Sequence, residues 1–167
     1  MPFTPLHMGP GALLKAILQG SFSLMVFGWS QIVMDIQPLY VMINDTSHLE
    51  LHGFSHTYLG ATLLAILSAL SGKYLSELGL KLLGLSTAMQ PINIGWRIAF
   101  FSAFLGTYSH VVLDSIMHSD IQPYYPFAVG NHLLDIISNE QLHEFCIYSG
   151  IVGGVIYCIA QLLAGKM

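Results

Sequence analysis

Two pairs of ligand-type side chains stand four residues apart in this chain. His52 and His56 form an H-x3-H pair, and His110 and Asp114 form an H-x3-D pair. Because residues four apart project from the same face of an α-helix, each pair can hold one metal ion from one side. Neutral imidazole and carboxylate groups suit zinc and similar divalent ions. The spacing therefore predicts a divalent metal site, with zinc as the expected ion.

A further carboxylate, Asp35, interrupts an apolar stretch. A charged side chain at the centre of a membrane-spanning helix costs about 2.5–3.5 kcal/mol on the translocon scale. Neither Asp35 nor Asp114 has a nearby Lys or Arg in the apolar stretches, so metal or histidine must compensate the charge. A lone membrane histidine is more often a hydrogen-bonded packing residue. For the group as a whole, a proton relay is the main alternative to metal.

His118 extends the H-x3-D series by another four residues. On a straight helix His110 and His118 lie about 12 Å apart, too far to share one ion. Either the helix ends just before His118 and the chain folds back, or the site holds two ions, as many phosphate-ester hydrolases do. We predict catalytic roles for His118 and Asp120, with Asp120 as the proton acceptor.

The composition is that of a membrane protein. The 167 residues are 54% hydrophobic and 8% charged, whereas a soluble domain is about 25% charged. Lipid must therefore surround much of the chain, and the length fits one domain, residues 1–167. With five Lys and Arg and a net charge of −4, a nucleic-acid-binding patch is excluded.

Four apolar stretches are long enough, or nearly so, to cross a membrane as helices. They cover residues 22–43, 54–71, 94–117 and 145–164. The segment Gly11–Gln19 is too short to cross alone, and we expect it to be re-entrant or interfacial if it is a separate helix. The expected fold is an all-α integral membrane protein of about four transmembrane helices.

The basic residues all fall on one side of these stretches. They are Lys15, Lys73, Lys81, Arg97 and Lys166, and the loops 44–53 and 118–144 contain neither Lys nor Arg. By the positive-inside rule, both termini and the loop 72–97 face the cytoplasm, and the histidine-rich loops face outward. This orientation predicts a multi-pass protein of the bacterial inner membrane.

The loop 72–97 has a helical charge pattern of its own. Lys73, Glu77 and Lys81 follow one another at four-residue spacing, with leucines on the other face. This pattern is typical of an amphipathic helix lying in the membrane interface. An ordinary solvated connector is an equally good interpretation.

Several motifs, in order along most of the chain, are shared with a known family. They are Phe3-Thr4-Pro5-Leu6-His7-Met8-Gly9, Asp35-Ile36-Gln37-Pro38, Leu51-His52-Gly53-Phe54-Ser55-His56-Thr57, and Gly106-Thr107-Tyr108-Ser109-His110 through Leu113-Asp114 to Pro126-Phe127. In these residues the chain resembles the YdjM-type membrane proteins, which are described as inner-membrane metal-dependent hydrolases, some of them labelled LexA-binding. The resemblance implies a shared polar set of His7, Asp35, His52, His56, His110 and Asp114. Since the charge rule places the N-terminus inside, His7 can join this set only if Gly11–Gln19 dips into the membrane.

Together these patterns predict a membrane-embedded hydrolase whose divalent ion activates a water molecule. A site at the membrane face suits an amphiphilic phosphate or acyl ester, so the expected partners are membrane lipids and a small or lipid-like substrate. The alternative is a non-enzymatic carrier of metal ions or protons, and a purely structural membrane protein comes third. A carrier needs polar residues along its whole path, whereas the inner halves of the spans are apolar apart from Lys15 and Gln19. This difference favours the enzyme.

Overall fold

The regular elements of the described chain are all helical, which confirms the all-α prediction. The structure is a computed structural model and describes residues 5–44, 51–85 and 92–165. The elements within these ranges are α1 (Met8–Leu18), η1 (Gln19–Ser21), α2 (Leu24–Met34), α3 (Ile36–Ile43), η2 (Phe54–His56), α4 (Tyr58–Leu82), α5 (Trp96–Met117) and α6 (Asn139–Leu163). Lys166 and the first residues of the Phe3–Gly9 motif lie outside them.

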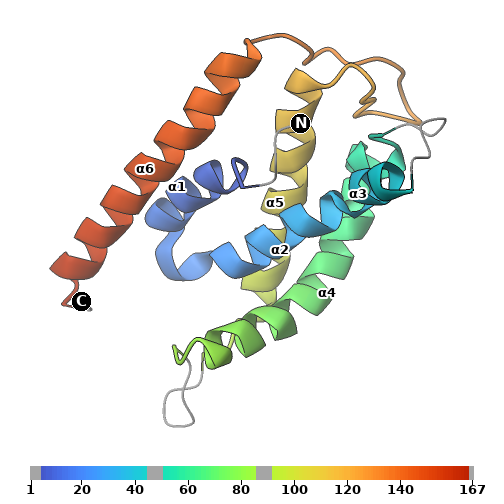
Figure 1. Cartoon of the computed structure of the whole chain (residues 1–167). Helices are drawn as coiled ribbons and strands as arrows, with labels where there is room; N and C mark the ends of the chain where they lie inside the picture. The colour runs from blue at the N-terminus through green and yellow to red at the C-terminus, as the bar shows by residue number, and fades with distance from the viewer. Residues whose placement is uncertain (1–4, 45–50, 86–91, 166–167) are drawn as a thin grey trace.

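The helices gather around α5 (Figure 1). α2 and α4 both pack against α5, and α1 packs along α6. Small residues allow these close approaches: a Cβ atom on Gly106 of α5 would lie 1.9 Å from the Ser30 hydroxyl of α2. A Cβ atom on Gly153 of α6 would lie 2.4 Å from the backbone nitrogen of Leu13 in α1. Such contacts are typical of helices that associate without a strong hydrophobic driving force.

The stretch expected as one span, residues 22–43, is two helices. α2 ends and α3 begins at Asp35, which caps both. Pro38 lies in the first turn of α3 and has no N–H to donate to the carbonyl of Met34, so the helical ladder is interrupted there. With 11 and 8 residues, neither helix can cross a membrane alone. The break places the Asp35 carboxylate at a helix junction.

The second expected span and the expected interfacial helix form one continuous element. α4 runs from Tyr58 to Leu82, and the Thr57 side chain caps its start by accepting a hydrogen bond from the Gly60 N–H. The predicted i, i+4 pair of Lys73 and Glu77 is present, with Lys73 buried. The amphipathic pattern therefore belongs to the C-terminal part of α4, continuous with the second apolar stretch, and does not form a helix of its own.

Two described helices, α4 and α6, are long and apolar enough to cross a membrane. α6 exposes a long series of large apolar side chains, including Ile151 at 59% and Val155 at 53% exposure. It begins at Asn139, earlier than the expected 145, because Ser138 and Gln141 form a capping box. Among the described residues no further helix meets both the length and the hydropathy criterion, so four spans are not confirmed.

The Gly11–Gln19 segment forms most of α1, and the chain reverses after it into α2 (Figure 1). Lys15 closes this reversal, since its ammonium donates to the carbonyls of Gln19 and Phe22 at 2.7 and 2.9 Å. The beginning of α1 points back toward α5, where His7 lies 3.4 Å from Asp114. The expectation that the N-terminal residues lie on the side of the basic residues is therefore not met by His7.

Candidate metal centre

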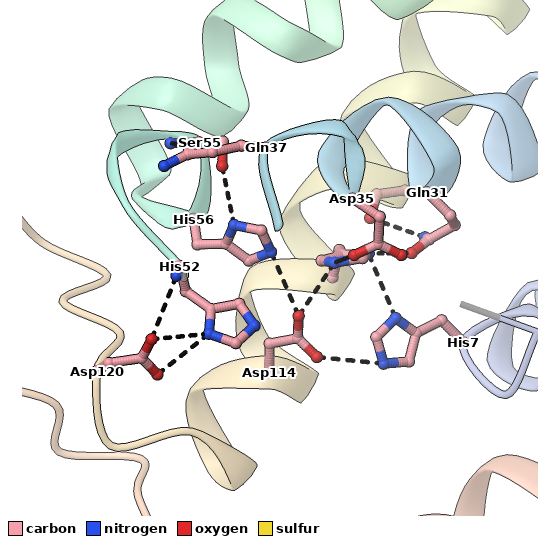
Figure 2. A network of polar contacts seen from close by, with 11 residues as sticks. His7, Gln31, Asp35, Gln37, His52, Ser55, His56, Asp114 and Asp120 are labelled. Atoms are coloured by element: carbon pink, nitrogen blue, oxygen red, sulfur yellow. Dashed lines mark hydrogen bonds and ion pairs between the residues drawn. The ribbon is translucent and has the colours of Figure 1, made fainter. Parts of the chain in front are cut away.

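Ligand-type side chains from four separate parts of the chain converge beside α5 (Figure 2). α5 itself supplies His110 and Asp114, and their four-residue spacing on one helix face is confirmed. Asp35 comes from the junction of α2 and α3, and His56 from η2. His7 reaches the same place from the start of α1. We call Asp35, His56, His110 and Asp114 the Asp114 group; their ligand atoms all lie within 4.8 Å of one another.

The Asp114 carboxylate is the centre of this group. Its Oδ2 atom lies 3.1 Å from His110 Nε2 and 3.4 Å from His56 Nε2, and its Oδ1 atom lies 3.4 Å from His7 Nε2. His110 Nε2 is also 3.2 Å from Asp35 Oδ1. The Asp114 side chain is only 4% exposed. A buried carboxylate is thus surrounded by imidazole rings and by no described Lys or Arg side chain.

The atoms that face one another in this group do not complete ordinary hydrogen bonds. Nε2 of His7, His56 and His110 and Oδ1 of Asp114 are buried, and their contacts with one another, at 3.1–3.4 Å, do not have the geometry of well-formed hydrogen bonds. Leaving such an atom unpaired costs about 1–3 kcal/mol. Donors held at about 2.0–2.1 Å by one tetrahedral ion are about 3.3–3.4 Å apart, close to the observed separations of 3.1–3.4 Å. The group therefore has the spacing and the unpaired lone pairs of a metal-binding site.

The Nδ1 atoms of His110 and His56 contact side chains outside the Asp114 group. His110 Nδ1 lies 2.6 Å from Gln31 Oε1, and the Gln31 amide donates to the carbonyl of Gly106 at 3.0 Å. His56 Nδ1 lies 2.9 Å from the Ser55 hydroxyl. A histidine that donates its Nδ1–H in this way presents Nε2 as a lone pair, the tautomer that binds metal. Gln31 was not predicted from the sequence, although its position four residues before Asp35 places both on one helix face.

A second set of potential ligands adjoins the first. His52, His118 and Asp120, here called the Asp120 group, also bring their ligand atoms within 4.8 Å of one another. Asp120 Oδ2 lies 3.0 Å from His52 Nδ1 and accepts the His52 backbone N–H at 3.2 Å. The rings of His52 and His118 are 4.2 Å apart, and those of His52 and His56 are 4.8 Å apart. The two groups are therefore neighbours.

The structure corrects the prediction for the H-x3-H pair and shows where the helix before His118 ends. His52 and His56 do not share a helix face, because His56 lies in η2, His52 precedes it, and α4 begins only at Tyr58. His56 joins the Asp114 group, and His52 joins the Asp120 group. α5 ends at Met117, and His118 continues with extended backbone angles. His118 therefore folds toward His52 and does not extend the His110–Asp114 face by another turn.

Three histidines outside the long helices, His7, His52 and His118, favour the uncharged form. Burial lowers the pKa of His7 to about 4 and also lowers the pKa values of His52 and His118. For Asp120 burial alone would raise the pKa, but the hydrogen bonds from His52 hold it below its usual value. Neutral imidazoles and an ionised carboxylate are the forms that bind metal at neutral pH.

A cavity of about 790 Å³ opens beside both groups. Asp35, His52, Asp114 and His118 contribute to its lining, and most of the remaining wall is apolar. This size is typical of small-molecule binding sites, which combine an apolar wall with a few polar groups.

Comparisons of the chain with protein-family models, curated proteins and solved structures find no match. The resemblance to YdjM-type proteins therefore stays a prediction from the motifs, and the case for the site depends on its own geometry.

Proposed function

We propose that this protein is a membrane-embedded, metal-dependent hydrolase, as its resemblance to the YdjM-type family implies. The observation that carries the proposal is the convergence of buried histidine Nε2 atoms on the Asp114 carboxylate at metal-ligand spacing. The mixed His and Asp donors suit zinc among the common divalent ions. His7, Asp35, His56, His110 and Asp114 are the candidate ligands, of which three or four would hold the ion directly and leave a position for water, with His52 beside them in the neighbouring group.

A bound divalent ion supplies a Lewis acid that polarises the scissile ester and activates water. Hydrolysis joins the water oxygen to the acyl carbon or the phosphorus atom and breaks the bond to the leaving oxygen, which takes up a proton. Asp120 is placed to accept the proton from water, since it is 38% exposed beside His52 and is ionised at neutral pH. His118 lines the cavity at the same end and contacts the substrate.

The region away from the site supports an enzyme over a carrier. Toward the other end of α4 and α5, the described core contains an apolar cluster of Val26, Ala69, Ile94, Ala99 and Ala103. Buried hydroxyls near the helix crossings, such as those of Ser30 and Thr107, donate to carbonyls of their own helices. They do not form a hydrogen-bonded chain across the molecule among the described contacts. A continuous polar path, which a carrier needs, is not built from these residues.

We propose that the membrane surrounds the whole helix bundle as well as the two candidate spans, α4 and α6. We propose a multi-pass protein of the inner membrane in which α5 also spans and the α1–α2 reversal enters from the outer side. Exposed apolar residues on α6 then face lipid, their favourable environment. In this orientation Lys73, Lys81 and Arg97 face the cytoplasm, as the charge rule requires, Lys15 lies at the inner end of the α1–α2 reversal, and His7 faces outward with the site.

This orientation predicts an unusual labelling pattern at the N-terminus. On a background of Cys146→Ala and Cys158→Ser, the variants Pro5→Cys and His132→Cys should react with an impermeant maleimide from outside the inner membrane. Gly20→Cys, at the exposed reversal after α1, should react only after the membrane is permeabilised. Labelling of Pro5→Cys and His132→Cys from opposite sides would contradict the placement of His7 beside Asp114.

Because Gln31 orients the His110 ring, replacing Gln31 should lower the affinity of the site for metal. Gln31→Ala removes the oxygen that lies 2.6 Å from His110 Nδ1 and leaves only the longer 3.3 Å contact with His7 Nδ1, so metal affinity should fall about 10–100-fold. Gln31→Glu keeps an acceptor oxygen and should restore most of the affinity. Gln161→Ala is the matched control, because Gln161 bonds to Gln19 instead. Competition with a chelating dye measures all three, and wild-type affinity in Gln31→Ala would remove Gln31 from the site.

A further inference from the structure

The cavity beside the site follows one face of two consecutive helices. Its lining includes Met25, Gly28 and Ile32 of α2 and Ile36, Leu39 and Met42 of α3. These positions recur every three or four residues, which is the repeat of a single helix face. Met8 and Leu75 contribute from α1 and α4. We call this apolar part of the cavity the α2 groove.

The part of the cavity at the α2–α3 junction differs chemically from the α2 groove on either side of it. Asp35, His52, Asp114 and His118 all contribute to the lining and all belong to the two ligand groups. The other polar side chains of the lining are Ser76 and Trp29, and the Trp29 indole N–H is already bonded to Ser71. The cavity is therefore amphiphilic, with ligands for a cation at the α2–α3 junction and apolar side chains along α2 on one side and α3 on the other.

The dimensions of the groove suit one extended hydrocarbon chain. From Asp35 to Met25 the α2 axis advances about 15 Å. With C–C bonds of about 1.5 Å, this distance takes roughly a dozen methylene groups in zigzag. Met25, Ile32 and Leu39 are 41%, 53% and 51% exposed, so the groove is open along its flank. A chain can enter sideways from lipid without threading through the protein.

We propose that the α2 groove binds the alkyl chain of an amphiphilic ester, whose oxygen-rich head lies at the ligand residues of the cavity, Asp35, His52, Asp114 and His118. The inference rests on the proposed hydrolase function and adds the place of the substrate's alkyl chain and the orientation of the substrate in the cavity. The head supplies anionic or ester oxygens that match a bound cation, and the chain covers apolar side chains of α2 and α3. Because the groove follows a single helix face, it takes one chain of the substrate.

A photoreactive substrate analogue tests the orientation directly. The probe is an alkyl phosphonate with a diazirine at the end of its tail, added to zinc-loaded protein in lipid nanodiscs. A phosphonate has no ester bond to be hydrolysed, so it stays bound at the head. After irradiation, mass spectrometry should find label on Leu24, Met25 or Leu75, and a shorter tail should move the label toward Ile32. The matching alkyl alcohol, which lacks the acidic head, should label these positions far less.

A blocking variant provides the second readout. Ile32→Trp puts a large ring into the groove from a position that is already half-exposed, so the fold should tolerate it. Label at Met25 should then fall by about tenfold, while metal content stays at the wild-type level. Ile151→Trp on α6 is the matched control, since Ile151 is equally exposed and does not line the cavity.

The outcomes separate this inference from the hydrolase proposal. Label spread over α6 as densely as over α2, or equal label from the alcohol and the phosphonate, would overturn the α2 groove as a substrate site. Cleavage of a short water-soluble ester by the same preparation would leave the hydrolase proposal standing. Groove labelling by the phosphonate in a metal-loaded protein that cleaves neither short nor long esters would reject the hydrolase and keep an amphiphile-binding site.

Discussion

Purified Asp114→Asn protein is expected to lose most of its metal, whereas the wild-type protein retains about one or two equivalents. Asp114 presents Oδ2 to His56 and His110 and Oδ1 to His7, so its carboxylate connects three of the histidines. Asparagine keeps the shape of the side chain but replaces a charged carboxylate by a neutral carbonyl, which is a weak ligand for zinc. Elemental analysis of the two proteins, purified without chelators, measures the difference.

The control for Asp114→Asn is the same substitution at an exposed position. Asp135→Asn lies in the loop before α6, and Asn tolerates the positive φ of 57° found there. It should bind metal like the wild-type protein. Added zinc should raise the unfolding temperature of the wild-type and Asp135→Asn proteins, because the ion binds the folded state. A full metal content in Asp114→Asn would rule out the H-x3-D site.

The parts of the site that the sequence predicted correctly are those that depend on one continuous helix. His110 and Asp114 both fall within α5, so their spacing alone fixed their relative direction. The H-x3-H pair failed because the helix after it starts at Tyr58, after the cap at Thr57. Spacing of four residues carries meaning only inside a helix, and an apolar stretch does not mark the residue at which its helix begins.

Local sequence patterns could not predict the contacts between segments that are distant in the chain. The break at Asp35 has a local cause in Pro38, and the sequence contained that signal. The position of His7 has no local cause. It depends on the packing of α1 against α6, where a Cβ atom on Gly9 would overlap the carbonyl of Cys146. The charge rule orients whole spans and does not place a short helix that reverses within the bundle.

His118→Ala and Asp120→Ala are expected to keep the metal of the Asp114 group and to lose turnover. Neither residue belongs to that group; both gather around His52, where Asp120 holds the ring nitrogen at 3.0 Å and His118 lies against the ring. A hydrolytic ion keeps one position open for water, so residues beside the ligands must handle the substrate and the proton. Loss of a positioned proton acceptor lowers turnover about 10²–10⁴-fold.

Metal content and turnover must be measured on the same preparations, because together they separate three roles. Unchanged metal with lost cleavage of a phosphate- or acyl-ester panel assigns His118 and Asp120 to catalysis. A fall from two equivalents to one assigns them, with His52, to a second ion, as the compact Asp120 group allows. His132→Ala is the control, since this exposed histidine of the same loop has no place in either group. Wild-type protein that binds metal, cleaves no ester of the panel and moves ions across liposome membranes would decide for the carrier.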